Sequence, residues 1–145
     1  MKKLFFLSVV FLLGMSRLSA QGAWDVLVTW DIMPTSTCQF MDLPNDRFVV
    51  FITIYDEANN VTVVNNAYNI EPNDANESTF DVQSAVQSHC DDPSLTYIPS
   101  YIIYTSVRMV HIPNQYVYCY ERSTQSPYNC TQFSNGIQLD LIEFN

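Results

Sequence analysis

Glycine is scarce in this chain. Of its 145 residues only three are glycine, Gly14, Gly22 and Gly136, and they stand far apart. Loops that hold the phosphates of nucleotides need several glycines close together, because the backbone must approach the phosphate without interference from a Cβ atom. No such loop can be assembled here, and asparagine is expected to supply the turns, as at Asn59 and Asn60. The sequence therefore argues against nucleotide-dependent chemistry.

Lysine is absent after residue 3, and the basic start of the chain belongs to a segment of its own. Lys2 and Lys3 precede the apolar run LFFLSVVFLLGM, which is followed by LSA, whose small residues a signal peptidase accepts. We predict that residues 1–20 are a cleaved signal peptide and that the mature chain begins at Gln21. The apolar run is short for a bilayer span and no second one follows, so a secreted protein, periplasmic or extracellular, is expected.

The mature chain would carry very little positive charge. Without residues 1–20 its strong bases are Arg47, Arg108 and Arg122, against fifteen acids, which gives a net charge of −12. Nucleic acids and anionic lipids bind clusters of lysine and arginine, so neither nucleic acid nor a membrane is expected as a partner. Cations, basic proteins and neutral sugars remain possible, and the charge also keeps an exported domain soluble.

The four cysteines, Cys38, Cys90, Cys119 and Cys130, all lie in the mature part. An even count in an exported chain predicts two disulfides. Three pairings are open, and we favour Cys38–Cys90 with Cys119–Cys130, because nested or crossed pairings require more coincidences of position. Zinc is not expected, since there is no C-x-x-C motif and His89 beside Cys90 has no partners at ligand spacing.

Alternating apolar and polar residues dominate the mature chain and indicate strands. The predicted strands cover 24–32, 47–55, 61–65, 79–87, 100–112, 116–122 and 137–144. The second of them, RFVVFITIY, is apolar on both faces, as in a central strand. Only residues 82–90 offer a short helix as an alternative. We therefore predict a single all-β domain, residues 21–145, built as an antiparallel β-sandwich of about seven strands.

This strand pattern resembles immunoglobulin-like modules of exported proteins as a class. The signature of true immunoglobulin domains is missing, since Val117 stands two residues before Cys119, where a corner tyrosine is typical, and no tryptophan lies between plausible core cysteines. A C2-like or transthyretin-like sandwich would give the same strand count. The resemblance thus implies an immunoglobulin-like or similar sandwich and no particular family.

Few residues offer catalytic chemistry. No G-x-S-x-G motif surrounds a serine, and His89 and His111 are expected to be structural. Neighbouring acids such as Asp91 and Asp92 fit a solvated loop better than a hydrolase pair. We predict no catalytic residue and no cofactor. Calcium is the metal that the acidic loops could hold, because it takes carboxylate and amide oxygens. Its weak candidate ligands are Asp42, Asp46, Glu71, Asp74 and Glu77.

The stretch YVYCYER places Tyr116, Tyr118 and Tyr120 on one face of a strand. With Arg108 they are weak candidates for a ligand-binding face, because exposed aromatic rings stack on sugars or peptides, although tyrosine is also an ordinary half-buried sheet residue. The hairpin register decides their neighbours. A three-residue loop sets Arg108 opposite Tyr120, whereas a four-residue loop sets it opposite Glu121, and the opposite charges favour the second register.

Together these features predict a secreted, non-catalytic β-sandwich that binds a carbohydrate or protein ligand. A structural subunit of a cell-surface or extracellular assembly is the alternative, since an open sheet edge can pair with another copy or another protein. A small secreted hydrolase is a weaker alternative.

Overall fold

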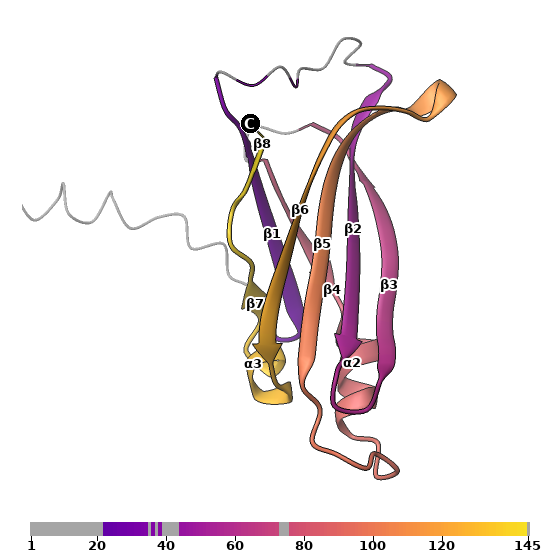
Figure 1. The fold of residues 1–145 in the computed structure, drawn as a ribbon, viewed down its shortest axis with the longest axis vertical. Coiled ribbons are helices and arrows are strands. Elements are labelled where there is room, and N and C mark those ends of the chain that lie inside the picture. The colour runs from indigo at the N-terminus through magenta and orange to yellow at the C-terminus, as the bar shows by residue number, and fades with distance from the viewer. Residues whose placement is uncertain (1–21, 35, 37, 39–43, 73–75, 145) are drawn as a thin grey trace, which may run out of the picture.

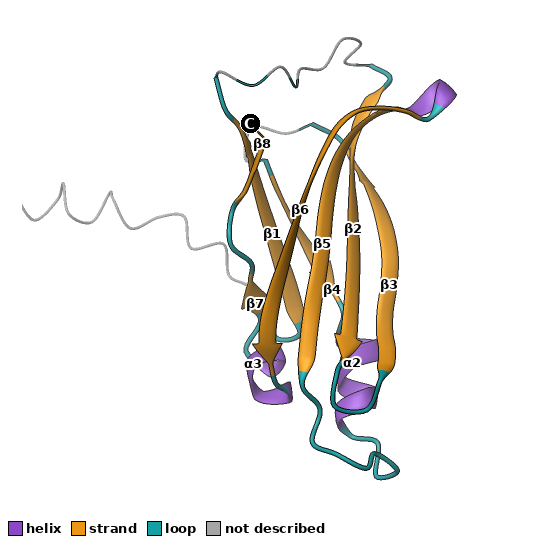
Figure 2. Ribbon diagram, viewed as in Figure 1, coloured by secondary structure: helices purple, strands orange, loops and turns teal. Residues whose placement is uncertain are grey.

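The computed structural model of the protein describes residues 22–34, 36, 38, 44–72 and 76–144. Those residues form eight β-strands, two α-helices and one short 3₁₀ helix, η1 (Figure 1, Figure 2). In chain order they are β1 (Asp25–Ile32), β2 (Asp46–Asp56), β3 (Val61–Ile70), β4 (Glu77–Asp81), α2 (Gln83–Cys90), β5 (Tyr101–His111), η1 (Ile112–Asn114), β6 (Tyr116–Tyr128), α3 (Cys130–Ser134), β7 (Ile137–Gln138) and β8 (Ile142–Phe144). Neither α-helix in these ranges has the length and apolar character that a bilayer crossing requires.

The strands form two sheets, so the prediction of an all-β chain is confirmed. One sheet has the order β3-β2-β5-β6, and each neighbouring pair is antiparallel. In the other, β1 pairs with β4 antiparallel on one side, and with β7 and β8 in parallel on the other. Figure 1 shows the long strands running vertically, with α2 and α3 at the lower end and η1 at the upper end.

One hydrophobic core collects side chains from both sheets. Alternate residues of β2 and β5 are buried in it, together with Val26, Val28 and Trp30 of β1. The ring of Trp30 meets that of Phe48 on β2, with 4.9 Å between the ring centroids. Burying one side chain of this size contributes about 1.5–3 kcal/mol. The apolar alternation of the sequence therefore marks the residues that hold the two sheets together.

Three interior elements differ from the sequence prediction. β3, predicted over residues 61–65, is twice as long and continues to Ile70. The stretch 79–87 is divided, because β4 ends at Asp81 and is followed by α2, the short helix that the sequence offers as the alternative there. β6 is longer than predicted and continues to Tyr128.

Helix α3 has no counterpart in the sequence prediction. It is only five residues long, which is too short to show a helical period. Its start is fixed by a capping box, in which the side chain of Asn129 accepts from the amide of Gln132 at 3.0 Å and the side chain of Gln132 accepts from the amide of Asn129 at 2.9 Å.

The predicted last strand, residues 137–144, is divided into β7 and β8. Both run parallel to β1, and between them the amide of Leu139 donates to the carbonyl of Leu27 at 3.0 Å. The count is thus eight strands in place of about seven, and the sheets are not purely antiparallel. Parallel and antiparallel strands share the same two-residue period of side chains, so the sequence pattern carries no sign of direction.

The two disulfides are confirmed, but the favoured pairing is wrong. Cys38 is joined to Cys119, and Cys90 to Cys130. Most of the residues between Cys119 and Cys130 lie in the extended β6, which rises about 3.3 Å per residue, whereas the Cα atoms of a disulfide lie within about 7 Å of each other. These two cysteines are therefore too far apart to pair. Instead α3 contacts α2, and this contact brings Cys130 to Cys90.

The favoured register of the β5–β6 hairpin is wrong as well. Arg108 lies opposite Tyr120 and not opposite Glu121. Between this pair and the turn the register shifts, and Tyr118 is the extra residue of a β-bulge. A bulge interrupts the alternation of faces, so the three tyrosines do not form one regular row. The register predicted from the sequence assumed a hairpin without a bulge, and this assumption is the reason for the error.

Candidate ligand-binding face

The outer face of the β3-β2-β5-β6 sheet, away from the core, carries a depression of about 560 Å³. Alternate residues of β2, β5 and β6 supply its lining, because successive side chains of a strand point to opposite faces. Its outward-facing side chains include Phe51, Thr53, Tyr104, Ser106, Arg108 and Arg122.

The strand register arranges this lining in rows that cross three strands. The two central rows are Thr53, Tyr104 and Thr124, and Phe51, Ser106 and Arg122. Hydroxyl groups, aromatic rings and a guanidinium group therefore lie beside one another on one surface. None of the described lining residues is an acid.

Two arginines belong to this lining. The guanidinium carbon of Arg108 lies 4.2 Å from the ring centroid of Phe51, which is a cation–π contact. Arg122 is exposed on the neighbouring strand β6. Neither arginine forms a hydrogen bond or ion pair with another described residue, and the Nε atom of Arg108 is buried without a partner there. Arg47, by contrast, pairs with Glu71 at 3.4 Å.

The structure brings together only part of the predicted tyrosine site. Tyr120 is 60% exposed and lies opposite Arg108, on the same outer face. Tyr116 is 59% exposed but sits at the hairpin end of β6. Tyr118 is half-buried, and its hydroxyl donates to the carboxylate of Asp46 at 3.2 Å. Arg108 and Tyr120 therefore belong to the candidate face, whereas Tyr116 and Tyr118 lie beyond it.

Asp46, the first residue of β2, is fully buried at the upper end of the sheet. Its Oδ1 atom accepts from Nδ1 of His111 at 3.0 Å and from the hydroxyl of Tyr118. The donors come from β5 and β6. The carboxylate therefore fastens the strands of one sheet to each other.

The five predicted calcium ligands are not gathered into one site by the described residues. Asp46 is engaged as above, Glu71 is exposed after β3, and Glu77 begins β4. Asp42 and Asp74 lie outside the described residues. Within the described ranges, no three histidine, cysteine or acidic side chains group as metal ligands. Calcium binding thus stays a prediction from the sequence.

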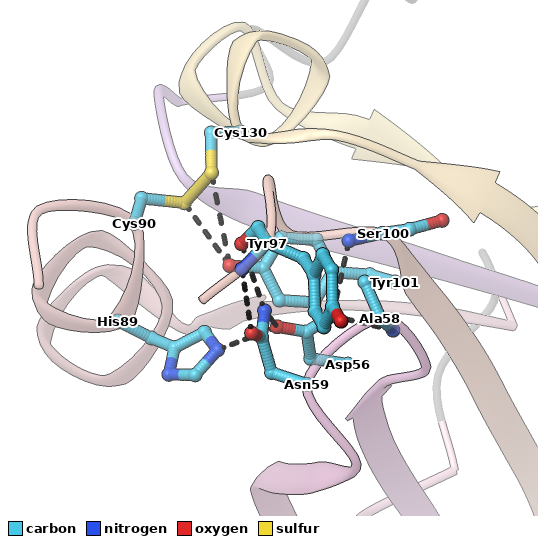
Figure 3. Close-up of polar contacts among 9 residues, drawn as sticks. All are labelled: Asp56, Ala58, Asn59, His89, Cys90, Tyr97, Ser100, Tyr101 and Cys130. Atoms are coloured by element: carbon cyan, nitrogen blue, oxygen red, sulfur yellow. Dashed lines mark hydrogen bonds and ion pairs between the residues drawn. A yellow bond between two sulfur atoms is a disulfide. The ribbon is translucent and has the colours of Figure 1, made fainter. Parts of the chain in front are cut away.

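Asp56, the last residue of β2, is the centre of a second buried cluster (Figure 3). Its Oδ2 atom accepts from Nε2 of His89 at 2.9 Å and from the side-chain amide of Asn59 at 2.7 Å. Its Oδ1 atom accepts from the backbone amides of Ala58 at 3.0 Å and Ser100 at 3.1 Å. These donors come from the β2–β3 turn, from α2 and from the segment before β5. One carboxylate therefore fastens three separate segments.

The hydrogen bonds also control the protonation of this carboxyl group. Burial alone raises the pKa of Asp56, but the donors from His89, Asn59 and Ser100 outweigh burial and hold the pKa below its usual value of 3.8. Asp56 is therefore ionised at neutral pH. Burial first, and the charge of Asp56 second, raise the pKa of Tyr101, so the phenol stays protonated.

The Cys90–Cys130 disulfide lies at this same end (Figure 3). The hydroxyl of Tyr101 is 3.1 Å from Sγ of Cys90 and 3.7 Å from Sγ of Cys130. Because the sulfur atoms of a disulfide carry no proton, the hydroxyl is the donor. The aspartate cluster and the disulfide are thus neighbours around one buried tyrosine.

The sequence-based prediction missed most of the candidate face. Phe51 and Thr53 belong to the strand interpreted as buried on both faces, yet both are only partly covered on the outer side. A signal was present in β5, where Tyr104, Ser106 and Arg108 alternate with core residues. Three polar or aromatic residues on one face of a central strand indicate a face that is not packed against a second layer.

Comparison of the chain with protein-family models, with curated proteins and with solved structures finds no match. The function is therefore inferred from the geometry of the site.

Proposed function

We propose that this chain is an exported, non-catalytic module that binds carbohydrate, with the outer face of the β3-β2-β5-β6 sheet as its ligand surface. The depression of about 560 Å³ carries the proposal, because it sets the exposed ring of Tyr104 beside the hydroxyls of Thr53 and Ser106. Sugar rings stack on aromatic faces, and their hydroxyls take hydrogen bonds from polar side chains.

The strand order supports an immunoglobulin-like sandwich as the scaffold. An immunoglobulin domain places strands B and E together in one sheet and strands C′, C, F and G in the other. Here β1 pairs with β4, and the other sheet has the order β3-β2-β5-β6, so six strands correspond in order, whereas β7 and β8, parallel to β1, have no counterpart among them. In such a sandwich the outer face of the second sheet points away from the core between the sheets.

Export is supported by two features of the chain. Residues 1–20 have the charged start, apolar run and small residues of a signal peptide. Two disulfides persist in an oxidising compartment, as the periplasm and the extracellular space are.

The use of the histidines supports binding without catalysis. His89 and His111 each hold a buried aspartate, and within the described residues neither ring hydrogen-bonds a serine or threonine hydroxyl. Neither residue lines the depression. The groups that commonly act as bases therefore serve the ends of the sheet, and the depression offers rings, hydroxyls and arginines.

A glycan array tests the proposal, using the protein purified after export. We expect binding to a defined set of glycans, and we expect Tyr104→Ala to abolish it with little change in melting temperature, because Tyr104 is 43% exposed. Tyr97→Ala is the matched control, since Tyr97 is 64% exposed in the loop before β5. Array binding that survives Tyr104→Ala, or that Tyr97→Ala removes equally, would contradict a ligand surface on this face.

A structural subunit is a second candidate, and strand β3 favours it. β3 is ten residues long, lies at the edge of its sheet and is exposed over much of its length. An edge strand of this length can add a strand from another chain. Light scattering across a hundredfold range of concentration distinguishes the two candidates. A monomer at every concentration would exclude self-assembly, and a defined oligomer would favour it.

A further inference from the structure

We propose that the depression binds an acidic sugar, and that Arg108 and Arg122 together hold its oxyanion, a carboxylate or a sulfate. This inference rests on the proposed function and names the chemical class of its ligand.

Among the described residues, the two arginines have no acid to neutralise. The chain has fifteen acids, yet neither Arg108 nor Arg122 pairs with one among the described residues. Arg47, the third arginine of the described residues, does have its acid, Glu71. In so acidic a protein, two unpaired guanidinium groups in one depression form a local site for an anion.

The strand register places both groups close enough to share one ligand. Arg108 lies opposite Tyr120, and Arg122 is two residues further along β6 on the same face. Such diagonal neighbours have Cα atoms about 7–8 Å apart, which long side chains span readily. Each guanidinium group offers parallel N–H donors that match the two oxygens of a carboxylate or sulfate. Arg108 stacks on Phe51 of β2, on the side of β5 away from β6, so its side chain turns toward Arg122 when the two share a ligand.

The remaining lining fits a sugar better than an acidic peptide. Next to Arg122 and Ser106 is the row of Thr53, Tyr104 and Thr124, which gives three hydroxyl-bearing side chains in register across three strands. Vicinal hydroxyls of a sugar match such a row, and the ring of Tyr104 offers a stacking surface. An extended peptide would be recognised mainly through backbone hydrogen bonds, whereas the depression presents side chains on the outer face of β2, β5 and β6.

The overall charge limits how acidic this sugar is. A mature chain with a net charge of −12, from three arginines and fifteen acids, repels dense polyanions, but exposed charges are screened beyond about 8 Å at physiological salt. No described lining residue is acidic, so repulsion inside the depression is small. The ligand that fits is an oligosaccharide with sparse oxyanions and not a highly charged polymer.

Calorimetric titration with four probes tests this inference. The probes are an unsulfated chondroitin tetrasaccharide, its 4-sulfated form, neutral chitotetraose and hexaglutamate. We expect Arg122→Gln to weaken binding of an acidic tetrasaccharide about tenfold or more, as the loss of a charged hydrogen bond does. Arg108→Gln should act in the same direction. Arg47→Gln is the charge-matched control, because it removes an arginine that is already paired, and it should leave the affinity unchanged.

The outcomes separate this inference from the proposed function. Binding of the unsulfated form alone assigns the oxyanion as carboxylate, and a gain with the sulfated form assigns it as sulfate. Chitotetraose that binds as tightly as the acidic probes, with no effect of either arginine variant, overturns the inference and leaves a sugar-binding module. Equal binding of hexaglutamate, or equal loss in Arg47→Gln, overturns it as well. A failure of all three saccharides to bind overturns both proposals.

Discussion

The two ends of the β3-β2-β5-β6 sheet are fastened by the same kinds of group in different arrangements. At the upper end in Figure 1, Asp46 accepts from His111 and Tyr118, whose strands are already joined by backbone hydrogen bonds. At the lower end, Asp56 accepts from donors on α2, on the β2–β3 turn and on the segment before β5. These contacts of the upper cluster stay within one sheet, whereas the lower cluster also attaches α2, a helix that belongs to neither sheet.

The disulfides follow the same division. Cys38–Cys119 ties the segment between β1 and β2 to the start of β6, near the Asp46 cluster. Cys90–Cys130 ties α2 to α3 beside the Asp56 cluster. Each end thus has one buried aspartate, one of the two histidines and one disulfide. The comparison indicates that side-chain hydrogen bonds and disulfides join segments mainly at the ends of the sheet, where the backbone pairing of strands stops.

Removal of each disulfide should have the largest effect. With separations of 81 and 40 residues, the loop-entropy model gives losses of about 4.5 kcal/mol for Cys38–Cys119 and about 4 kcal/mol for Cys90–Cys130. Paired Cys→Ala variants measured by urea unfolding give the global cost. Hydrogen exchange measures the local cost. We expect the amides of α2 to exchange through local opening, without global unfolding, only in the Cys90→Ala/Cys130→Ala variant. If the amides of α2 stay fully protected from exchange in that variant, the Cys90–Cys130 disulfide is not what attaches α2.

The substitution Asp56→Asn should have the next largest effect, a loss of about 3 kcal/mol in unfolding free energy. An asparagine amide cannot accept from all the donors that the buried carboxylate binds, so some of them stay unsatisfied. The amides of Ala58 and Ser100, which donate to this carboxylate, should lose their protection from exchange. Asp31→Asn is the control, since Asp31 is exposed on β1. Unchanged protection of Ala58 and Ser100 would show that the cluster does not fasten these segments.

The same variant makes the role of Asp56 visible as a pH dependence. The folded-state pKa of Asp56 lies below that of the unfolded chain, so its contribution is complete above about pH 4 and is lost as the pH falls through the folded-state value. Unfolding free energies measured between pH 7 and pH 3 should therefore fall more steeply in the parent protein than in Asp56→Asn. Parallel curves would contradict this contribution.

The smallest effect is expected at the upper end. Tyr118→Phe removes the hydroxyl that donates to the Asp46 carboxylate and should lower the unfolding free energy by about 1.5 kcal/mol, the low end for a hydrogen bond to a charged group. Tyr116→Phe, its neighbour at 59% exposure, should change the unfolding free energy very little. Urea unfolding of both variants measures the difference. Equal losses of unfolding free energy in the two variants would show that the hydrogen bond from Tyr118 to Asp46 does not stabilise the fold.

The strands of this fold could be predicted because burial leaves a local trace. Residues of β5 from Tyr101 to Met109 alternate between buried and more exposed positions, and that alternation is visible in the sequence. The pairing of Cys38 with Cys119 left no such trace, because it depends on which segments meet at one end of the sheet. The bulge at Tyr118 was equally hidden, since it follows from the hairpin and its turn together.

The candidate site was predicted only in part for a related reason. Arg108 and Tyr120 were named from their residue types, and the structure sets them opposite each other. Phe51 and Arg122 were missed because membership of this face depends on which strands are neighbours. A strand sequence shows which residues share a face of that strand, but not which residues of other strands complete the surface.

The parallel pairing of β1 with β7 and β8 also has a consequence for the order of folding. The hairpins β2–β3 and β5–β6 close through short turns, so they can form from local contacts while the chain is still emerging. One edge of β1 must wait for segments from the other end of the described chain. During that interval its backbone donors and acceptors are open to a neighbouring molecule. The most vulnerable period for aggregation therefore begins when β1 appears and ends when β8 arrives.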